Sequence, residues 1–134
     1  MKEITSSTYK KDKFYDGIKS VVATILTKAK VITPIDVFIC LGNLTKEDYE
    51  NWRFKKIPYL EKVIKCNLSS ANRKLRILKY IAHEIGLKPS KTVYVSWGKG
   101  KKVFLKFSKT GNELIEVLYS THYVLKDGEE EKIT

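Results

Sequence analysis

The side chains of this chain that are best suited to chemistry are its cations, and they are concentrated in one segment. Residues 51–110 hold sixteen Lys and Arg against two acids, Glu61 and Glu84, which is a net charge of +14. The first fifty residues net +1 and the last twenty-four net −4, so the chain total is +11. Because a general preference for lysine would spread along the chain, this concentration indicates a surface that faces a polyanion.

Three clusters within this segment supply the candidate contacts. Three lysines occupy the turn from Gly98 to Lys102, where they would contact phosphates without reading bases. Two arginines, a tyrosine and His83 recur one turn apart on a predicted helix, and arginine suits phosphates while tyrosine stacks on bases. The third cluster is a basic turn after Arg53. The predicted nucleic-acid-binding residues are Lys55, Lys56, Arg73, Arg76, Tyr80, Lys99, Lys101 and Lys102. The plainer alternatives are a solvated hairpin tip and the ordinary polar face of an amphipathic helix.

No catalytic residue, metal ligand or cofactor is predicted. His83-Glu84 lacks the second histidine of a zinc-protease helix, and no phosphate-cradling glycine loop is complete. Cys40 and Cys66 do not have metal-ligand spacing and lie among apolar neighbours, so both are expected to be reduced and buried.

The two acids of the basic segment are expected to be ionised. Glu61 and Glu84 have only cations as charged neighbours in this segment, and cations lower the pKa of a carboxyl group, which opposes a general-acid role. An enzyme, such as a nuclease assembled from dispersed residues, is therefore the third function in order of preference.

Apolar spacing and helix-end signals predict which elements position these clusters. The expected helical segments are residues 12–29, 34–41, 46–53, 57–64, 70–85 and 113–123. Alternation of apolar and polar residues over 91–97 and 103–108 predicts a β-hairpin around the Lys-rich turn. The segment 115–123 is rich in Val, Thr and Tyr, so a third strand remains an alternative there. The expected fold is α+β and mainly helical, with four to five helices plus one β-hairpin.

One domain is expected, because the chain shows no internal repeat and no linker. The predicted division is a flexible N-terminus over 1–11, a single globular domain over 12–125 and an acidic flexible tail over 126–134. No apolar run approaches the roughly 20 residues of a membrane helix, and the N-terminus shows no apolar leader. A cytoplasmic protein without a membrane partner is therefore expected.

Two parts of the chain resemble DNA-binding domains. The run from Leu41-Gly42 through Trp52-Arg53 to Ile57-Pro58 is similar to phage-repressor-type helix-turn-helix proteins, and the Lys-rich hairpin resembles the wing of winged-helix proteins. The would-be recognition helix carries three acids, which phosphate backbones repel. The favoured interpretation of this region is a packed set of short helices with Trp52 buried among them.

A second resemblance covers about residues 32–124. The motifs that carry it are Thr33-Pro-x-Asp36-Val, Asp48-x-x-x-Trp52-Arg, Ile57-Pro-Tyr-Leu-Glu61, Tyr94-Val-x-Trp-Gly-Lys-Gly100, Phe107-Ser-Lys-Thr-Gly111 and Thr121-His122-Tyr123. They resemble a family of small bacterial proteins with no assigned activity. This resemblance implies a bacterial, cytoplasmic origin and brings no catalytic residues. Residues 1–30 lie outside it, as an appended helix.

The sequence as a whole predicts a non-catalytic protein that binds nucleic acid, with DNA preferred over RNA. The basic helix face and the hairpin tip would contact the phosphate backbone. The alternative is a protein-interaction module whose basic face docks an acidic partner. The oligomeric state is left open.

Overall fold

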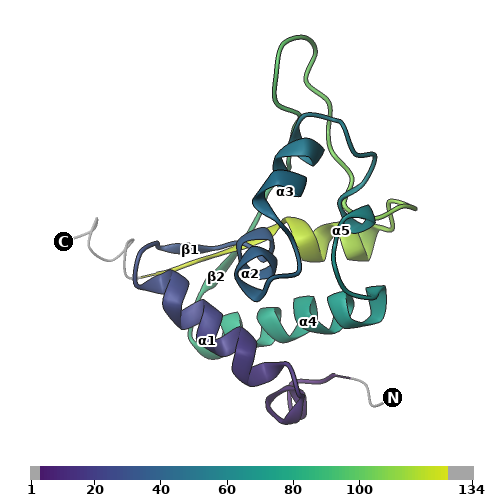
Figure 1. The fold of residues 1–134 in the computed structure, drawn as a ribbon. Helices are drawn as coiled ribbons and strands as arrows, with labels where there is room; N and C mark the ends of the chain where they lie inside the picture. Colours follow the sequence, from purple (N-terminus) through teal and green to yellow (C-terminus); the bar gives the residue numbers. More distant parts are fainter. Residues whose placement is uncertain (1–3, 127–134) are drawn as a thin grey trace, which may run out of the picture.

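Five α-helices and a small three-stranded antiparallel sheet form the part of the chain that this computed structural model describes, residues 4–126 (Figure 1). The α-helices are α1 Tyr15–Leu26, α2 Pro34–Leu41, α3 Lys46–Arg53, α4 Leu68–Glu84 and α5 Glu113–Ser120. The strands are β1 Val31–Ile32, β2 Lys88–Lys91 and β3 Thr121–Val124. Two short 3-10 turns, η1 Tyr9–Lys11 and η2 Leu60–Lys62, complete the fold. The predicted α+β, mainly helical class is confirmed.

The ends of α2 and α3 follow from local sequence. The Thr33 hydroxyl accepts a hydrogen bond from the Asp36 N–H at 3.0 Å, and Thr45 accepts from Asp48 at the same distance. Each cap satisfies a backbone donor that has no partner within its helix. Gly42 ends α2 with φ of 83°, a conformation that glycine adopts without steric cost. Both helices therefore have the predicted bounds.

The longest helix, α4, carries the main buried face of the fold. Asn67 caps it by accepting from the Ser70 N–H at 2.7 Å. Its buried residues recur every three or four positions and contact both halves of the core. They are Ala71, Lys74, Leu75, Ile77, Leu78, Ile81 and Ala82.

Two predicted elements differ in the structure. The helix expected over 57–64 is only the turn η2, because the N–H groups of Leu60 and Glu61 donate to the carbonyls of Lys106 and Phe107. The chain there pairs with a distant segment instead of closing helical turns. The predicted hairpin has its turn in place, but the only ladder pairing recorded for it among residues 4–126 is the bridge between Val95 and Phe104. Residues 91–97 and 103–108 are therefore not regular strands along their lengths.

The regular sheet lies elsewhere, in the order β1-β3-β2 with both pairs antiparallel. The final predicted helix ends at Ser120, three residues early, and the chain continues directly into β3. The β-branched and aromatic residues of 121–124 suit this central strand. Pro89 lies in the edge strand β2, where a missing N–H is tolerated.

The core divides into two apolar clusters. One lies where α1, α4 and β3 meet, and the other surrounds Trp52. The Trp52 side chain is 0% exposed, and its indole N–H donates to the Lys106 carbonyl at 2.8 Å. Its ring lies 5.0 Å from that of Phe107 and 5.7 Å from that of Tyr94, measured between centroids. The interpretation of Trp52 as a buried residue is confirmed.

The predictions for the N-terminal segment and for the two cysteines are wrong. From Ile4 onward the segment expected to be a flexible N-terminus packs on the domain, with Ile4 and Tyr9 both in the core. Local sequence does not show this because the partners lie on α4. Cys40 is exposed rather than buried, and Cys66 is half-buried and not joined to it. The predicted acidic tail lies outside the described residues except for Lys126.

Candidate nucleic-acid interface

Five of the eight predicted contact residues lie at one end of the molecule, where the hairpin projects beside the C-terminus of α3 (Figure 1). We call this surface the hairpin end. Its cations come from the turn after α3 and from the tip of the hairpin. They are Lys55, Lys56, Lys99, Lys101 and Lys102.

Three contacts fix the hairpin against the C-terminal end of α3. The Trp97 N–H donates to the Arg53 carbonyl at 2.7 Å. The Phe54 ring packs on Gly98, where an added Cβ would lie in van der Waals contact with it at 3.4 Å, and Phe54 meets Trp97 edge-on at 5.6 Å between centroids. Gly98 also has φ of 101°, so a larger residue would strain the backbone there. The basic turn after α3 and the hairpin tip therefore form one surface.

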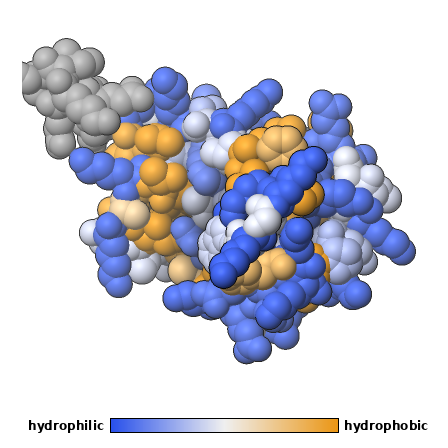
Figure 2. All heavy atoms as spheres, turned by 90° about the horizontal axis from the view of Figure 1, so that it is seen from above, coloured by the Kyte–Doolittle hydropathy of each residue, from blue (hydrophilic) through white to orange (hydrophobic). Residues whose placement is uncertain are grey.

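Aromatic and aliphatic side chains are exposed among these lysines. The exposed fractions are 47% for Phe54, 37% for Trp97 and 74% for Phe104. A shallow hollow of about 270 Å³ runs from Lys55 past Pro58 to residues 103–106 of the hairpin. Figure 2, which views the molecule from the hairpin side, shows hydrophilic side chains in front with hydrophobic groups directly beside them. Exposed rings between cations are the composition of surfaces that hold single-stranded nucleic acid.

Arg53 holds the aromatic side chains together beneath this surface. Its guanidinium lies 4.5 Å from the Trp97 ring centroid, 5.1 Å from that of Tyr94 and 5.9 Å from that of Tyr49. One of its nitrogens donates to the Tyr49 hydroxyl at 3.3 Å, and its buried Nε has no hydrogen-bond partner within residues 4–126. These cation–π contacts hold the partly exposed Trp97 ring against Arg53. Local sequence patterns do not indicate this role, because Tyr94 and Trp97 lie about 40 residues from Arg53 in the chain.

The lysines of the hairpin end are available to an external anion. In the described part of the chain, none of the five forms an ion pair with a carboxylate. Lys102 donates to the Gly98 carbonyl at 2.8 Å, which closes the tip of the turn. The other four carry no recorded hydrogen bond from their side chains within residues 4–126. A phosphate backbone would therefore meet cations that need not give up an internal partner.

The helix face at 73–83 is arranged differently. Arg73 forms an ion pair with Asp12, and Tyr80 stacks on Tyr9 with centroids 5.2 Å apart. Burial opposes ionisation of Asp12, but the Phe14 N–H and Arg73 together lower its pKa. Of the predicted contacts on this face, Arg76 is exposed and has no recorded partner among the described residues. The N-terminal segment thus covers part of the helix face predicted to bind nucleic acid. This face of α4 also lies apart from the hairpin end (Figure 1).

The pKa values of the two acids of the basic segment shift in opposite directions. The hydrogen bond from Lys19, helped by that from Tyr9, lowers the pKa of Glu84 to about 2, as predicted in direction. Burial raises the pKa of Glu61 even though the Tyr119 hydroxyl donates to it at 2.9 Å, so the prediction for Glu61 is wrong. Desolvation exceeds the opposing influence of the Tyr119 hydrogen bond, and the nearby Glu116 carboxylate raises the pKa of Glu61 further.

A metal-ligand cluster and a membrane-spanning helix are both absent from residues 4–126. No group of three or more His, Cys, Asp or Glu gathers there to hold a metal ion, and no helix is long and apolar enough to cross a membrane. His122 is half-buried, which lowers its pKa, and its Nε2 lies 2.8 Å from the Tyr94 hydroxyl.

Comparisons of the chain with protein-family models, with curated proteins and with solved structures found no match. The resemblances drawn from the sequence, to a bacterial family and to helix-turn-helix and winged-helix domains, therefore stay predictions.

Proposed function

We propose that this protein binds nucleic acid without catalysis, and that the hairpin end is its contact surface. The observation that carries the proposal is the convergence of five lysines with exposed Phe54, Trp97 and Phe104 on one surface. The lysines supply sequence-independent contacts to phosphates, and the rings supply stacking surfaces for unpaired bases. DNA is the preferred nucleic acid, with single-stranded segments favoured over duplex.

The direct test is fluorescence anisotropy with a labelled single-stranded DNA of mixed sequence, repeated as duplex and as RNA, over a range of salt concentrations. Five phosphate contacts give a slope of log affinity against log salt of about −3.5 for a single strand and about −4.5 for duplex. Replacing Lys99, Lys101 and Lys102 by Gln is expected to remove about 2 from the single-strand slope, since each contact contributes about −0.7.

The matched control replaces three exposed lysines from other elements, Lys11, Lys28 and Lys46, by Gln, and is expected to change the slope by less than half as much. Phe104→Ala is expected to weaken binding to single strands more than to duplex, because stacking contributes about 1–3 kcal/mol per base. No binding at micromolar protein in low salt, or equal losses in the two triple variants, would reject the proposal. Binding to polyglutamate as tightly as to DNA would favour an acidic protein partner instead.

A further inference from the structure

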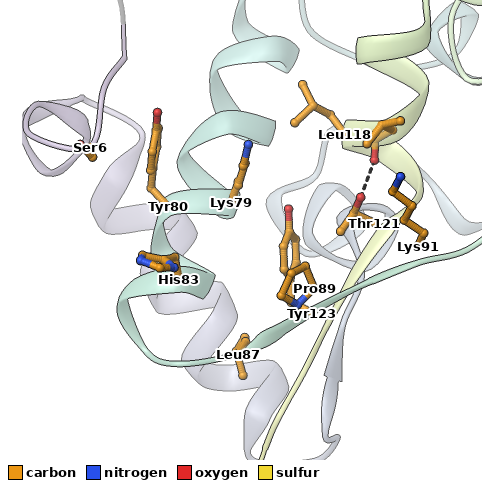
Figure 3. Close-up of a pocket in the computed structure, with 11 residues that line it drawn as sticks. Ser6, Lys79, Tyr80, His83, Leu87, Pro89, Lys91, Leu118, Thr121 and Tyr123 are labelled. Atoms are coloured by element: carbon orange, nitrogen blue, oxygen red, sulfur yellow. Dashed lines mark hydrogen bonds between the residues drawn. The ribbon is translucent and has the colours of Figure 1, made fainter.

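A second concave site lies away from the hairpin end, between α4 and the sheet (Figure 3). Its volume is about 510 Å³, which is within the range of small-molecule sites in proteins. Its walls come from the C-terminal half of α4, from β2 and from the junction of α5 with β3. None of the five lysines of the hairpin end lines it.

Secondary-structure geometry determines which side chains face this groove. In the β2–β3 ladder Pro89 pairs with Tyr123 and Lys91 pairs with Thr121. Alternate residues of a strand share a face, so these four lie on the same side of the sheet, while His122 and Val124 lie on the other. From α4, Lys79, Tyr80 and His83 line the opposite wall.

The floor of the groove is apolar. Tyr123 and Leu87 are buried and belong to the core, and Pro89 lines the groove as the cross-strand partner of Tyr123. Burial also raises the pKa of Tyr123 to about 12, so its hydroxyl stays neutral and adds no charge to the floor. Val117 and Leu118 of α5 close one end, and Val117 is 39% exposed. An apolar surface in a concave site favours a ligand with an apolar body.

The rim is cationic on both walls. Lys79 projects from α4 and Lys91 from β2, on opposite sides of Tyr123 (Figure 3). Neither side chain has a recorded hydrogen bond or ion pair within residues 4–126. His83 adds a further hydrogen-bond donor on the α4 side, and no acid lines the groove. This charge distribution is complementary to a single anionic group placed above an apolar floor.

We infer that this groove binds a small amphipathic anion, with its apolar body on Tyr123, Leu118 and Val117 and its anionic group between Lys79 and Lys91. The ligand class is a carboxylate with an apolar chain or ring. A carboxylate on a linear acyl chain and a carboxylate on a planar aromatic ring both belong to this class. The inference stands on the groove alone and does not depend on nucleic-acid binding.

The test is a titration of the isotope-labelled full chain, followed by the NMR shifts of its backbone amides. The probes are dodecanoate below its micelle concentration, 2-naphthoate, and dodecanol as a neutral analogue. Saturable shifts are expected at residues 79–91 and 117–123 and not at 98–102. The carboxylate is expected to bind at least tenfold more tightly than dodecanol, and the stronger of the two carboxylates identifies the shape of the apolar body.

Two pairs of variants make the assignment specific. Val117→Glu places a carboxylate at a partly exposed position in the groove, and at least a tenfold loss of affinity is expected; Leu114→Glu on the same helix, at a 72% exposed position outside the groove, is the control. Replacing Lys79 and Lys91 together by Ala is expected to abolish the preference for the carboxylate over dodecanol, whereas replacing Lys99 and Lys101 is not. Unsaturable shifts, shifts spread over the surface, or equal effects of the two Glu variants would overturn the inference.

Discussion

At the scale of single residues, Glu84 shows how a position in the fold determines the behaviour of a charged group. It accepts hydrogen bonds at 2.6 Å from both Lys19 and Tyr9, which lie in the N-terminal part of the chain rather than in the basic segment. These contacts lower the pKa of Glu84 and raise that of Tyr9 to about 12. The carboxylate thus joins η1 and α1 to the end of α4.

The lowered pKa of Glu84 predicts a specific dependence of stability on pH. Because the folded state holds its pKa near 2 and the ordinary value is near 4.5, ionised Glu84 stabilises the fold above about pH 4.5. That contribution is lost as the pH falls from about 4.5 toward 2. Glu84→Gln is therefore expected to unfold at lower urea concentration at pH 7, and to lose less stability than the natural protein between pH 5 and 3.

Glu47→Gln, at an exposed position in the first turn of α3, is the control for this prediction. Its free energy of unfolding is expected to stay within about 0.5 kcal/mol of the natural protein's at pH 7, 5 and 3, which is the contribution of an exposed acid in a first helical turn. Parallel pH profiles for Glu84→Gln and the natural protein would contradict the assigned role of Glu84.

At the scale of elements, the projecting hairpin depends on a contact from α5. Both oxygens of the Glu116 carboxylate accept from the Phe107 N–H, at 2.9 and 3.2 Å, and one also accepts from the N–H and the hydroxyl of Ser108, each at 2.7 Å. Phe107 and Ser108 are buried, so their N–H groups need this acceptor. The return strand of the hairpin is held to α5 by this contact, with few regular strand hydrogen bonds of its own.

Glu116→Ala is therefore expected to lower the free energy of unfolding by about 2–3 kcal/mol, because two buried N–H groups and the Ser108 hydroxyl lose a charged acceptor. Urea denaturation measures the change. Glu113→Ala, in the first turn of the same helix, removes the same charge without these hydrogen bonds and is expected to cost about 0.5 kcal/mol. Similar losses in the two variants would show that Glu116 does not hold the hairpin.

At the scale of the whole molecule, the N-terminal segment packs into the same apolar cluster as α1, α4 and β3. Tyr9 is 7% exposed, stacks on Tyr80 and meets Tyr15 edge-on at 5.7 Å between centroids. Its hydroxyl reaches Glu84, near the C-terminal end of α4. A segment expected to lie outside the domain is thus part of its packing.

Tyr9→Ala is expected to cost about 3–5 kcal/mol, the range for removing a large buried aromatic side chain. Tyr9→Phe keeps the ring and removes only the hydroxyl, so a loss of about 1–2 kcal/mol is expected from the hydrogen bond to Glu84. Thermal or urea unfolding of both variants separates the two contributions. A change below about 1 kcal/mol in Tyr9→Ala would show that the segment does not contribute to the core.

What the sequence determined by itself is mostly local. The bounds of α2 and α3, the glycine end of α2, the α4 stripe and the buried position of Trp52 follow from caps, helical spacing and apolar content within short windows. The same windows locate the cations that a polyanion would meet. These features depend on neighbours within a few residues, so they can be predicted from the sequence alone.

Only the tertiary structure decided which of these residues share a surface. The pairing of β3 with β1 and β2, the ion pair of Arg73 with Asp12 and the contacts of Arg53 with Tyr94 and Trp97 join segments from about 30 to 90 residues apart. Hydrogen-bond partners and burial at such separations are not encoded in local periodicity. The basic segment is consequently divided between a hairpin end open to an anion, a helix face partly covered by Asp12 and Tyr9, and a groove that Tyr80 and His83 help to line.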